Sequence, residues 1–193
     1  AAPAKGCASQ VLGVDLLKAK HVQQTHDLLY RHIMQTRQIS GLDTSTAVLC
    51  FESNLGFESQ HLMHAVTQRG LNRWVALAEG AGGALGWLAT NERKEAMCLQ
   101  MREALTVGNI ALSDGFFSLT SETRIAINNI RDELTRYSAI VEPSKTLFGK
   151  VRKTFTGKIS GLNDDLAICL QMALSALRVF YTNPKYQSFR PEL

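Results

Sequence analysis

Three carboxylates in this sequence stand where an α/β protein places its chemistry, at the ends of strands and helices. Glu52 directly follows an apolar segment, 47–51, and Asp164 and Asp165 directly precede the apolar run that starts at Leu166. Side chains at the carboxyl ends of parallel strands open into a crevice. Hard divalent cations prefer carboxylate oxygens, and acids that converge from separate elements can hold two such ions for phosphodiester hydrolysis. We therefore expect these acids to face a common crevice.

Each of these acids also has a purely structural interpretation, which the sequence leaves open. Glu52 could begin a solvated turn, and acids in a first helical turn stabilise the helix by accepting from free N–H groups and by favouring its dipole. Asp164 and Asp165 are adjacent, so on a helix they point about 100° apart. One is expected to contact a metal directly and the other to support it, and the sequence does not say which.

A basic segment precedes the aspartate pair. The range 143–163 contains no acidic residue, and Phe148 and Phe155 are interleaved with its cations. Cationic side chains bind the phosphate backbone of DNA without reading its sequence. We therefore expect a DNA-binding hairpin beside the acids, although a solvated basic hairpin would have the same composition. The predicted DNA contacts are Lys145, Lys150, Arg152, Lys153 and Lys158.

Composition limits the class of protein. The chain has 193 residues and a formal net charge of +4, which suits a single domain over 1–193 and permits a polyanionic partner without requiring one. Its four cysteines show no metal-binding spacing, and Cys50 and Cys169 lie in apolar runs, so we expect buried free thiols and a reducing, intracellular compartment. The sequence has neither a long uninterrupted apolar run nor a hydrophobic signal core, so we expect no membrane partner.

Alternating short apolar runs and amphipathic stretches predict an α/β fold, with a central sheet flanked by helices. Strands are expected at 10–17, 46–51, 73–78 and 109–112, and a hairpin at 138–141 and 151–155. Helices are expected at 20–38, 57–69, 92–105, 121–136 and 162–181, the third capped by Thr90 or Asn91.

Three segments together resemble the nuclease domain of terminase large subunits, the DNA-packaging proteins of herpesviruses and tailed phages. The first is VLCFESN at 48–54, an apolar strand that ends in an acid. The second and most specific is GKISGLNDDL at 157–166, a loop that contains lysine and glycine and leads into Asp-Asp-Leu. The third runs from Gly86-Trp87 through Lys94 to the short strand after Gly108. The resemblance covers about 10–181.

The resemblance implies an RNase H-like (integrase-like) fold with a central mixed sheet and a divalent-metal-dependent endonuclease using two Mg²⁺ or Mn²⁺ ions. Glu52 and Asp164 or Asp165 would be metal ligands, and Lys158 would sit near the scissile phosphate. The implied function is to cut concatemeric viral DNA during genome packaging. The implied partners are double-stranded DNA, other terminase subunits and the portal protein. The implied compartment is the host nucleus for a herpesvirus and the host cytoplasm for a phage.

The sequence departs from the family at its start. The family has a catalytic Asp on its first strand, usually followed by Pro, whereas Ala2-Pro3 stands here and Asp15 looks like a residue of a later strand. We therefore expect either that the Asp-bearing strand is missing or that this copy of the nuclease is inactive. No GxxxxGK[ST] loop is present, so we expect no ATPase domain in this chain. Two alternatives stay open: a non-catalytic DNA-binding or assembly module with an RNase H-like fold, and a small α/β enzyme unrelated to nucleic acid.

Overall fold

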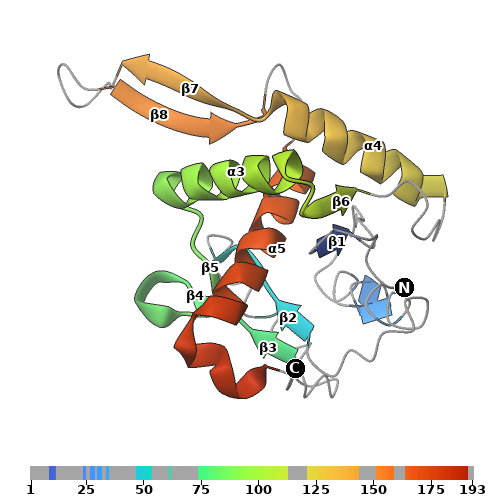
Figure 1. Ribbon diagram of the computed structural model, residues 1–193, viewed down its shortest axis with the longest axis vertical. Coiled ribbons are helices and arrows are strands. Elements are labelled where there is room, and N and C mark those ends of the chain that lie inside the picture. Colours follow the sequence, from blue (N-terminus) through green and yellow to red (C-terminus); the bar gives the residue numbers. More distant parts are fainter. Residues whose placement is uncertain are drawn as a thin grey trace.

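A computed structural model of the chain describes residues 9–11, 47–53, 74–112, 121–143, 151–158 and 164–190, together with the single positions 24, 27, 28, 30, 31, 34 and 61. These residues form a mixed arrangement of helices and short strands. The long C-terminal helix α5 (Asp165–Thr182) passes through its middle, and two further helices lie across its amino-terminal end (Figure 1). The expected α/β character is therefore present.

The described strands form four pairs, not a single central sheet. Three pairs are parallel: β1 (Ser9–Val11) with β6 (Ile110–Leu112), β2 (Ala47–Leu49) with β3 (Trp74–Ala76), and β4 (Ala78–Glu79) with β5 (Gly86–Trp87). Two contacts tie β2 to β5 and to the end of β3. The Leu77 N–H donates to the Leu49 carbonyl at 3.1 Å, and Glu52 forms an isolated parallel bridge with Trp87. Parallel strands thus surround the segment that carries Glu52.

Gly86 allows β5 to approach the end of β2. Its φ is +91°, a left-handed conformation that other residues rarely adopt, and a Cβ there would lie 2.9 Å from the Phe51 carbonyl oxygen. The Trp87 N–H donates to that same carbonyl at 2.8 Å. The expected strand 46–51 therefore ends its regular ladder at Leu49, because beyond that point its partner changes from β3 to β5.

Two helices cover the amino-terminal half of α5. They are α3 (Asn91–Thr106) and α4 (Ser121–Arg136). Thr90 is the N-cap of α3 and accepts from the Arg93 N–H at 3.3 Å, as expected from its hydroxyl position. A short 3-10 turn, η2 (Ala81–Gly83), connects β4 to β5, and another, η3 (Pro184–Phe189), follows α5. The expected helices 92–105 and 121–136 are confirmed within one residue at each end.

Helix α5 is the centre of the hydrophobic core. Eight of its side chains are buried, and they contribute to each of the clusters in the described residues. One cluster joins Phe180 and Met172 to Leu77 and Trp87, and another joins Leu166 to Ile130. By length and composition α5 could cross a membrane, the one such helix in the described ranges, but a core helix has the same composition. The absence of a membrane partner therefore stays a prediction.

An antiparallel hairpin projects from the body of the protein (Figure 1). Strand β7 (Ser138–Pro143) pairs with β8 (Val151–Thr156), with Ser138 opposite Thr156. All of β7 is exposed, whereas Phe155 of β8 is buried against the core. The expected hairpin is confirmed and is two residues longer in β7 than the sequence indicated.

Several other expected helices and strands are only partly described or have different bounds in the structure. Strand 10–17 is described only as β1, and strand 73–78 is divided into β3 and β4. The described positions within 20–38 are helical, as is His61, while the rest of 57–69 lies outside the described residues. The expected helix 162–181 begins later, at Asp165, because Asp164 has the non-helical φ of −132° of a cap residue.

Candidate functional site

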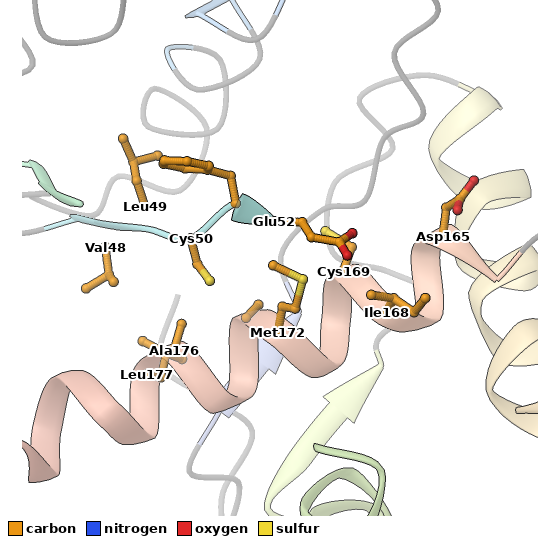
Figure 2. Close-up of a pocket in the computed structure, with 12 residues that line it drawn as sticks. Val48, Leu49, Cys50, Glu52, Asp165, Ile168, Cys169, Met172, Ala176 and Leu177 are labelled. Atoms are coloured by element: carbon orange, nitrogen blue, oxygen red, sulfur yellow. The ribbon is translucent and has the colours of Figure 1, made fainter. Parts of the chain in front are cut away.

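A cavity of about 690 Å³ lies between β2 and α5. Apolar side chains make most of its wall, and two carboxylates, those of Glu52 and Asp165, contribute to it (Figure 2). In the close-up both carboxylates lie at the same end of the cavity. Of the three acids expected to face a common crevice, Glu52 and Asp165 line this cavity and Asp164 does not.

The spacing of side chains along α5 explains this wall. The cavity is lined by Asp165, Ile168, Cys169, Met172 and Ala176, which stand at positions i, i+3, i+4, i+7 and i+11 of the helix. On an α-helix such positions share one face. The polar end of that face is its first residue, since Asp165 begins the helix and apolar side chains follow. The cavity is consequently apolar along α5 and acidic at its mouth.

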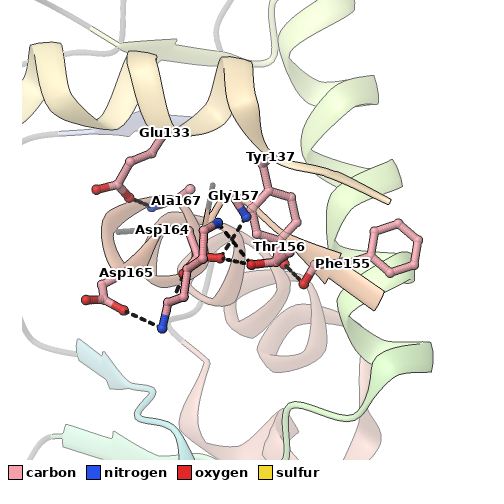
Figure 3. Close-up of polar contacts among 9 residues, drawn as sticks. Glu133, Tyr137, Phe155, Thr156, Gly157, Asp164, Asp165 and Ala167 are labelled. Atoms are coloured by element: carbon pink, nitrogen blue, oxygen red, sulfur yellow. Dashed lines mark hydrogen bonds and ion pairs between the residues drawn. The ribbon is translucent and has the colours of Figure 1, made fainter. Parts of the chain in front are cut away.

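Asp164 has a different environment from its neighbour. It is 1% exposed, whereas Asp165 is exposed. Its Oδ2 accepts from the Thr156 hydroxyl at 2.9 Å and from the Gly157 N–H at 2.8 Å (Figure 3). A Cβ at residue 157 would lie 3.1 Å from the Asp164 Cβ, so glycine permits this close approach. Asp164 therefore ties the end of β8 to the start of α5, while Asp165 faces the cavity.

Glu133, on α4, is a member of this cluster that the sequence analysis missed. It is 6% exposed, and its Oε2 accepts from the Ala167 N–H in the first turn of α5 at 2.9 Å (Figure 3). Asp164 makes no side-chain cap for its own helix, so Glu133 supplies that cap from another helix. The available signal was its position between Ile130 and Tyr137, both buried, on the inward face of α4.

Electrostatics at this cluster follow from its burial and its acidity. Burial raises the pKa of the Glu133 carboxyl, hydrogen bonds from Ala167 and Leu166 lower it, and the charges of Asp165 and Asp164 raise it further. Burial also raises the pKa of the Tyr137 phenol, whose hydroxyl donates to the Phe155 carbonyl at 3.4 Å. The start of α5 therefore concentrates negative charge.

Lys158 is the cation of this site. Its Nζ lies 3.7 Å from Asp164 Oδ1 and 3.9 Å from Asp165 Oδ1, and its side chain is 60% exposed. Its backbone N–H donates to the Thr156 hydroxyl at 3.0 Å, and that hydroxyl donates to Asp164. The sequence analysis placed Lys158 near the aspartate pair, and the structure brings the three side chains together.

The carboxylates fit a hard divalent cation in donor type, and one atom is left available for it. Asp164 Oδ1 is buried and has no hydrogen-bond partner in the structure. Asp165 and Glu52 add carboxylate oxygens, the ligands that Mg²⁺ and Mn²⁺ prefer. Among the residues that the structure describes, no group of three or more His, Cys, Asp or Glu side chains is arranged to hold one ion. Asp165 with Asp164 Oδ1 would hold a cation, and Glu52 lies along the same cavity.

The predicted DNA-binding residues are only partly described. Lys153 is exposed on β8, where it forms an ion pair with Glu95 of α3 and lies 4.9 Å from the centre of the Phe155 ring. Arg152 lies in β8 without a described side chain, and Lys145 and Lys150 are outside the described residues. The structure therefore places two of the five predicted cations, Lys153 and Lys158, and joins only Lys158 to the acids.

Two free thiols line the same cavity. Cys50 is half-buried and Cys169 is exposed, so the expectation that both are buried is wrong for Cys169. Burial raises the pKa of the Cys50 thiol to about 12, with smaller contributions from Cys169 and Glu79. A thiol with such a pKa stays protonated at neutral pH and is a poor nucleophile.

Comparison with known proteins adds no assignment. No family model matches the chain, and no curated protein and no solved structure is significantly similar to it. The segment 1–8 and Asp15, where the sequence departs from the terminase pattern, lie outside the described residues. Any assignment of function therefore depends on the geometry of the acids, on Lys158, and on the motif resemblance.

Proposed function

We propose that this chain is a divalent-metal-dependent DNA endonuclease that hydrolyses phosphodiester bonds. One observation carries the proposal. Glu52 and Asp165, which are far apart in the sequence, line the same end of one cavity, and the Lys158 ammonium lies beside Asp165. Carboxylates with a nearby cation suit a reaction in which metal ions and a phosphate must be held together.

The residues have separate roles in this proposal. Asp165 and Glu52 bind metal through the oxygens that face the cavity. Asp164 supports the site by fixing the loop at Gly157, and its Oδ1 is the atom that remains for a cation. Two bound Mg²⁺ or Mn²⁺ ions would activate the attacking water and stabilise the leaving oxygen. Lys158 binds the scissile phosphate, and the basic residues 145, 150, 152 and 153 hold the DNA backbone.

The finer assignment is also a proposal. We infer a single RNase H-like nuclease domain over 1–193, of the type in terminase large subunits, which cuts concatemeric viral DNA during packaging. Its supports are the order of the matching segments, the parallel strands beside Glu52, and the acids at the start of α5. The corresponding partners are double-stranded DNA, other terminase subunits and the portal protein, in the host nucleus or, for a phage, the host cytoplasm.

Plasmid cleavage tests the proposal directly. The purified chain should nick or linearise supercoiled plasmid in Mn²⁺, and a chelator should stop the reaction. Glu52→Gln and Asp165→Asn should each abolish cleavage while circular dichroism shows an unchanged fold. Glu103→Gln removes an exposed acid of α3 and serves as the matched control. Cleavage that survives in both site variants would refute the assignment of these residues.

A second candidate is a non-catalytic DNA-binding or assembly module with the same fold. The specific observation that favours it is the absence, in the described ranges, of any three acids, histidines or cysteines placed to bind one ion. This candidate predicts salt-sensitive DNA binding with no cleavage in any divalent metal. Failure to bind DNA even at low salt would instead favour an α/β enzyme that does not act on nucleic acid.

A further inference from the structure

We propose that Lys158 is an internal cation that occupies the Asp164–Asp165 pair in the metal-free protein, and that binding of a divalent metal displaces it. This inference deepens the proposed function and rests on its assignment of the aspartate pair to metal binding. It gives the lysine two positions: on the acids without metal, and free to reach a phosphate when metal is bound.

The position of the Lys158 ammonium is the first observation that supports the proposal. Lys158 Nζ lies 3.7 Å from Asp164 Oδ1 and 3.9 Å from Asp165 Oδ1, so it stands nearly equidistant from the two oxygens. The same Asp164 Oδ1 is buried and has no hydrogen-bond partner, while Oδ2 has two. A buried carboxylate oxygen without a partner is costly. The ammonium offsets this cost at a distance, where a bound cation would do so by direct contact.

The charges around the pair explain why a cation is required. Asp164, Asp165 and the nearby Glu133 come together at the start of α5, and the two aspartates raise the pKa of the Glu133 carboxyl. Lys158 is the basic residue with described ion pairs to this cluster. Without Lys158, the two aspartates would face each other's charge with no described cation beside them. Lysine and metal therefore compete for the same negative charge.

The Lys158 side chain can move away from the acids while its backbone stays in place. Its backbone is fixed by the hydrogen bond from its N–H to the Thr156 hydroxyl, which itself donates to Asp164. Its side chain, in contrast, is 60% exposed, and an exposed four-carbon stem can change rotamer without repacking a core. Displacement therefore leaves the loop in place and moves only the ammonium, which would stay within one side-chain length of the acids.

Mn²⁺ binding to the full chain tests the proposal without any activity measurement. We would titrate metal-free protein with Mn²⁺ and follow free Mn²⁺ by electron paramagnetic resonance. Lys158→Met should bind Mn²⁺ roughly three- to tenfold more tightly than the wild type, as expected for the loss of a partly exposed competing ion pair. Lys158→Arg, which keeps the charge, should stay near the wild type. Lys185→Met is the matched control, because Lys185 lies beyond the opposite end of α5.

The outcomes separate the inference from the proposed function. Tighter binding in Lys158→Met alone supports the inference, even if the wild type cuts no DNA and the nuclease assignment fails. Equal or weaker binding in Lys158→Met overturns it, even if the wild type cleaves plasmid. If Lys158→Met does not fold, Lys158→Gln replaces it under the same criterion. Absence of Mn²⁺ binding in every variant overturns the inference as well.

Discussion

The two ends of α5 differ in how the backbone groups of their last and first turns find hydrogen-bond partners. At the carboxyl end, Arg190 donates from Nε to the Phe180 carbonyl at 2.9 Å and from Nη2 to the Asn183 carbonyl at 2.6 Å. At the amino end, Glu133 accepts from the Ala167 N–H, and Asp165 begins the helix. Cations near the last carbonyls and acids near the first N–H groups both favour the helix dipole.

The two ends also differ in whether a buried polar atom stays without a hydrogen bond. The donors of Arg190 meet carbonyl acceptors directly, which closes that end of the helix. The amino end brings several acids together and leaves Asp164 Oδ1 buried without a hydrogen bond, with an ammonium 3.7 Å away. Polar groups that only stabilise a fold are normally paired. The nearest described partner of this oxygen is therefore an ammonium and not a hydrogen-bond donor in direct contact.

The largest expected effect separates the two ends by activity. Asp165→Asn should lower plasmid cleavage in Mn²⁺ at least about 100-fold, because Asp165 is a proposed metal ligand and such a ligand contributes several kcal/mol to the transition state. Arg190→Gln should leave the cleavage rate of the folded protein within about twofold, since the described hydrogen bonds of Arg190 go to backbone carbonyls at the other end of α5. Initial rates of supercoiled plasmid loss measure both. Similar losses in the two variants would remove the distinction between the ends.

A second comparison separates the two adjacent aspartates by stability. Asp164→Ala should lower the free energy of unfolding by about 2–4 kcal/mol, because it leaves the Thr156 hydroxyl and the buried Gly157 N–H without their acceptor. Asp165→Ala should change it by less than about 1 kcal/mol, since this side chain is exposed. Urea denaturation measures both values. An equal cost for the two would show that Asp164 does not anchor the loop.

A smaller effect is expected at the carboxyl end. Arg190→Ala should lower the free energy of unfolding by about 1–2 kcal/mol, because two carbonyls lose a charged donor that is partly buried. Arg178→Ala, which removes an exposed arginine of α5, should cost no more than about 0.5 kcal/mol. Thermal melts of the wild type, Arg190→Ala and Arg178→Ala measure the two losses of stability. A cost for Arg178→Ala as large as that for Arg190→Ala would contradict the role of Arg190.

The smallest effect concerns pH. The pKa of Glu133 is raised in the folded protein, so the folded state binds the proton more tightly than the unfolded state, and wild-type stability falls as pH rises above 4.5 towards the raised value. Glu133→Gln keeps an acceptor for the Ala167 N–H but cannot ionise, so it should lose this part of the pH dependence. Urea midpoints over that range measure the difference. Asp132→Asn, at an exposed position of α4, is the control and should retain the wild-type slope.

Local patterns determined much of the secondary structure. The Thr90 cap, the periodicity of 121–136 and the β7–β8 hairpin depend on neighbours in the sequence, and the structure agrees with each. The sequence also indicated that Glu52 and an acid of the aspartate pair would face one crevice, because strand and helix ends have predictable positions. The expected single central sheet did not follow in the same way, since strand pairing depends on distant segments.

The tertiary structure determined the different positions of Asp164 and Asp165, one buried and one facing the cavity. Asp164 and Asp165 are chemically identical neighbours, and only the approach of Gly157 and Thr156 makes the first a buried anchor while the second faces the cavity. Glu133 joined the site because α4 packs across the start of α5, a contact that no local pattern specifies. Sequence periodicity shows which face of a helix is buried, but the partner that meets that face is fixed only when the chain packs.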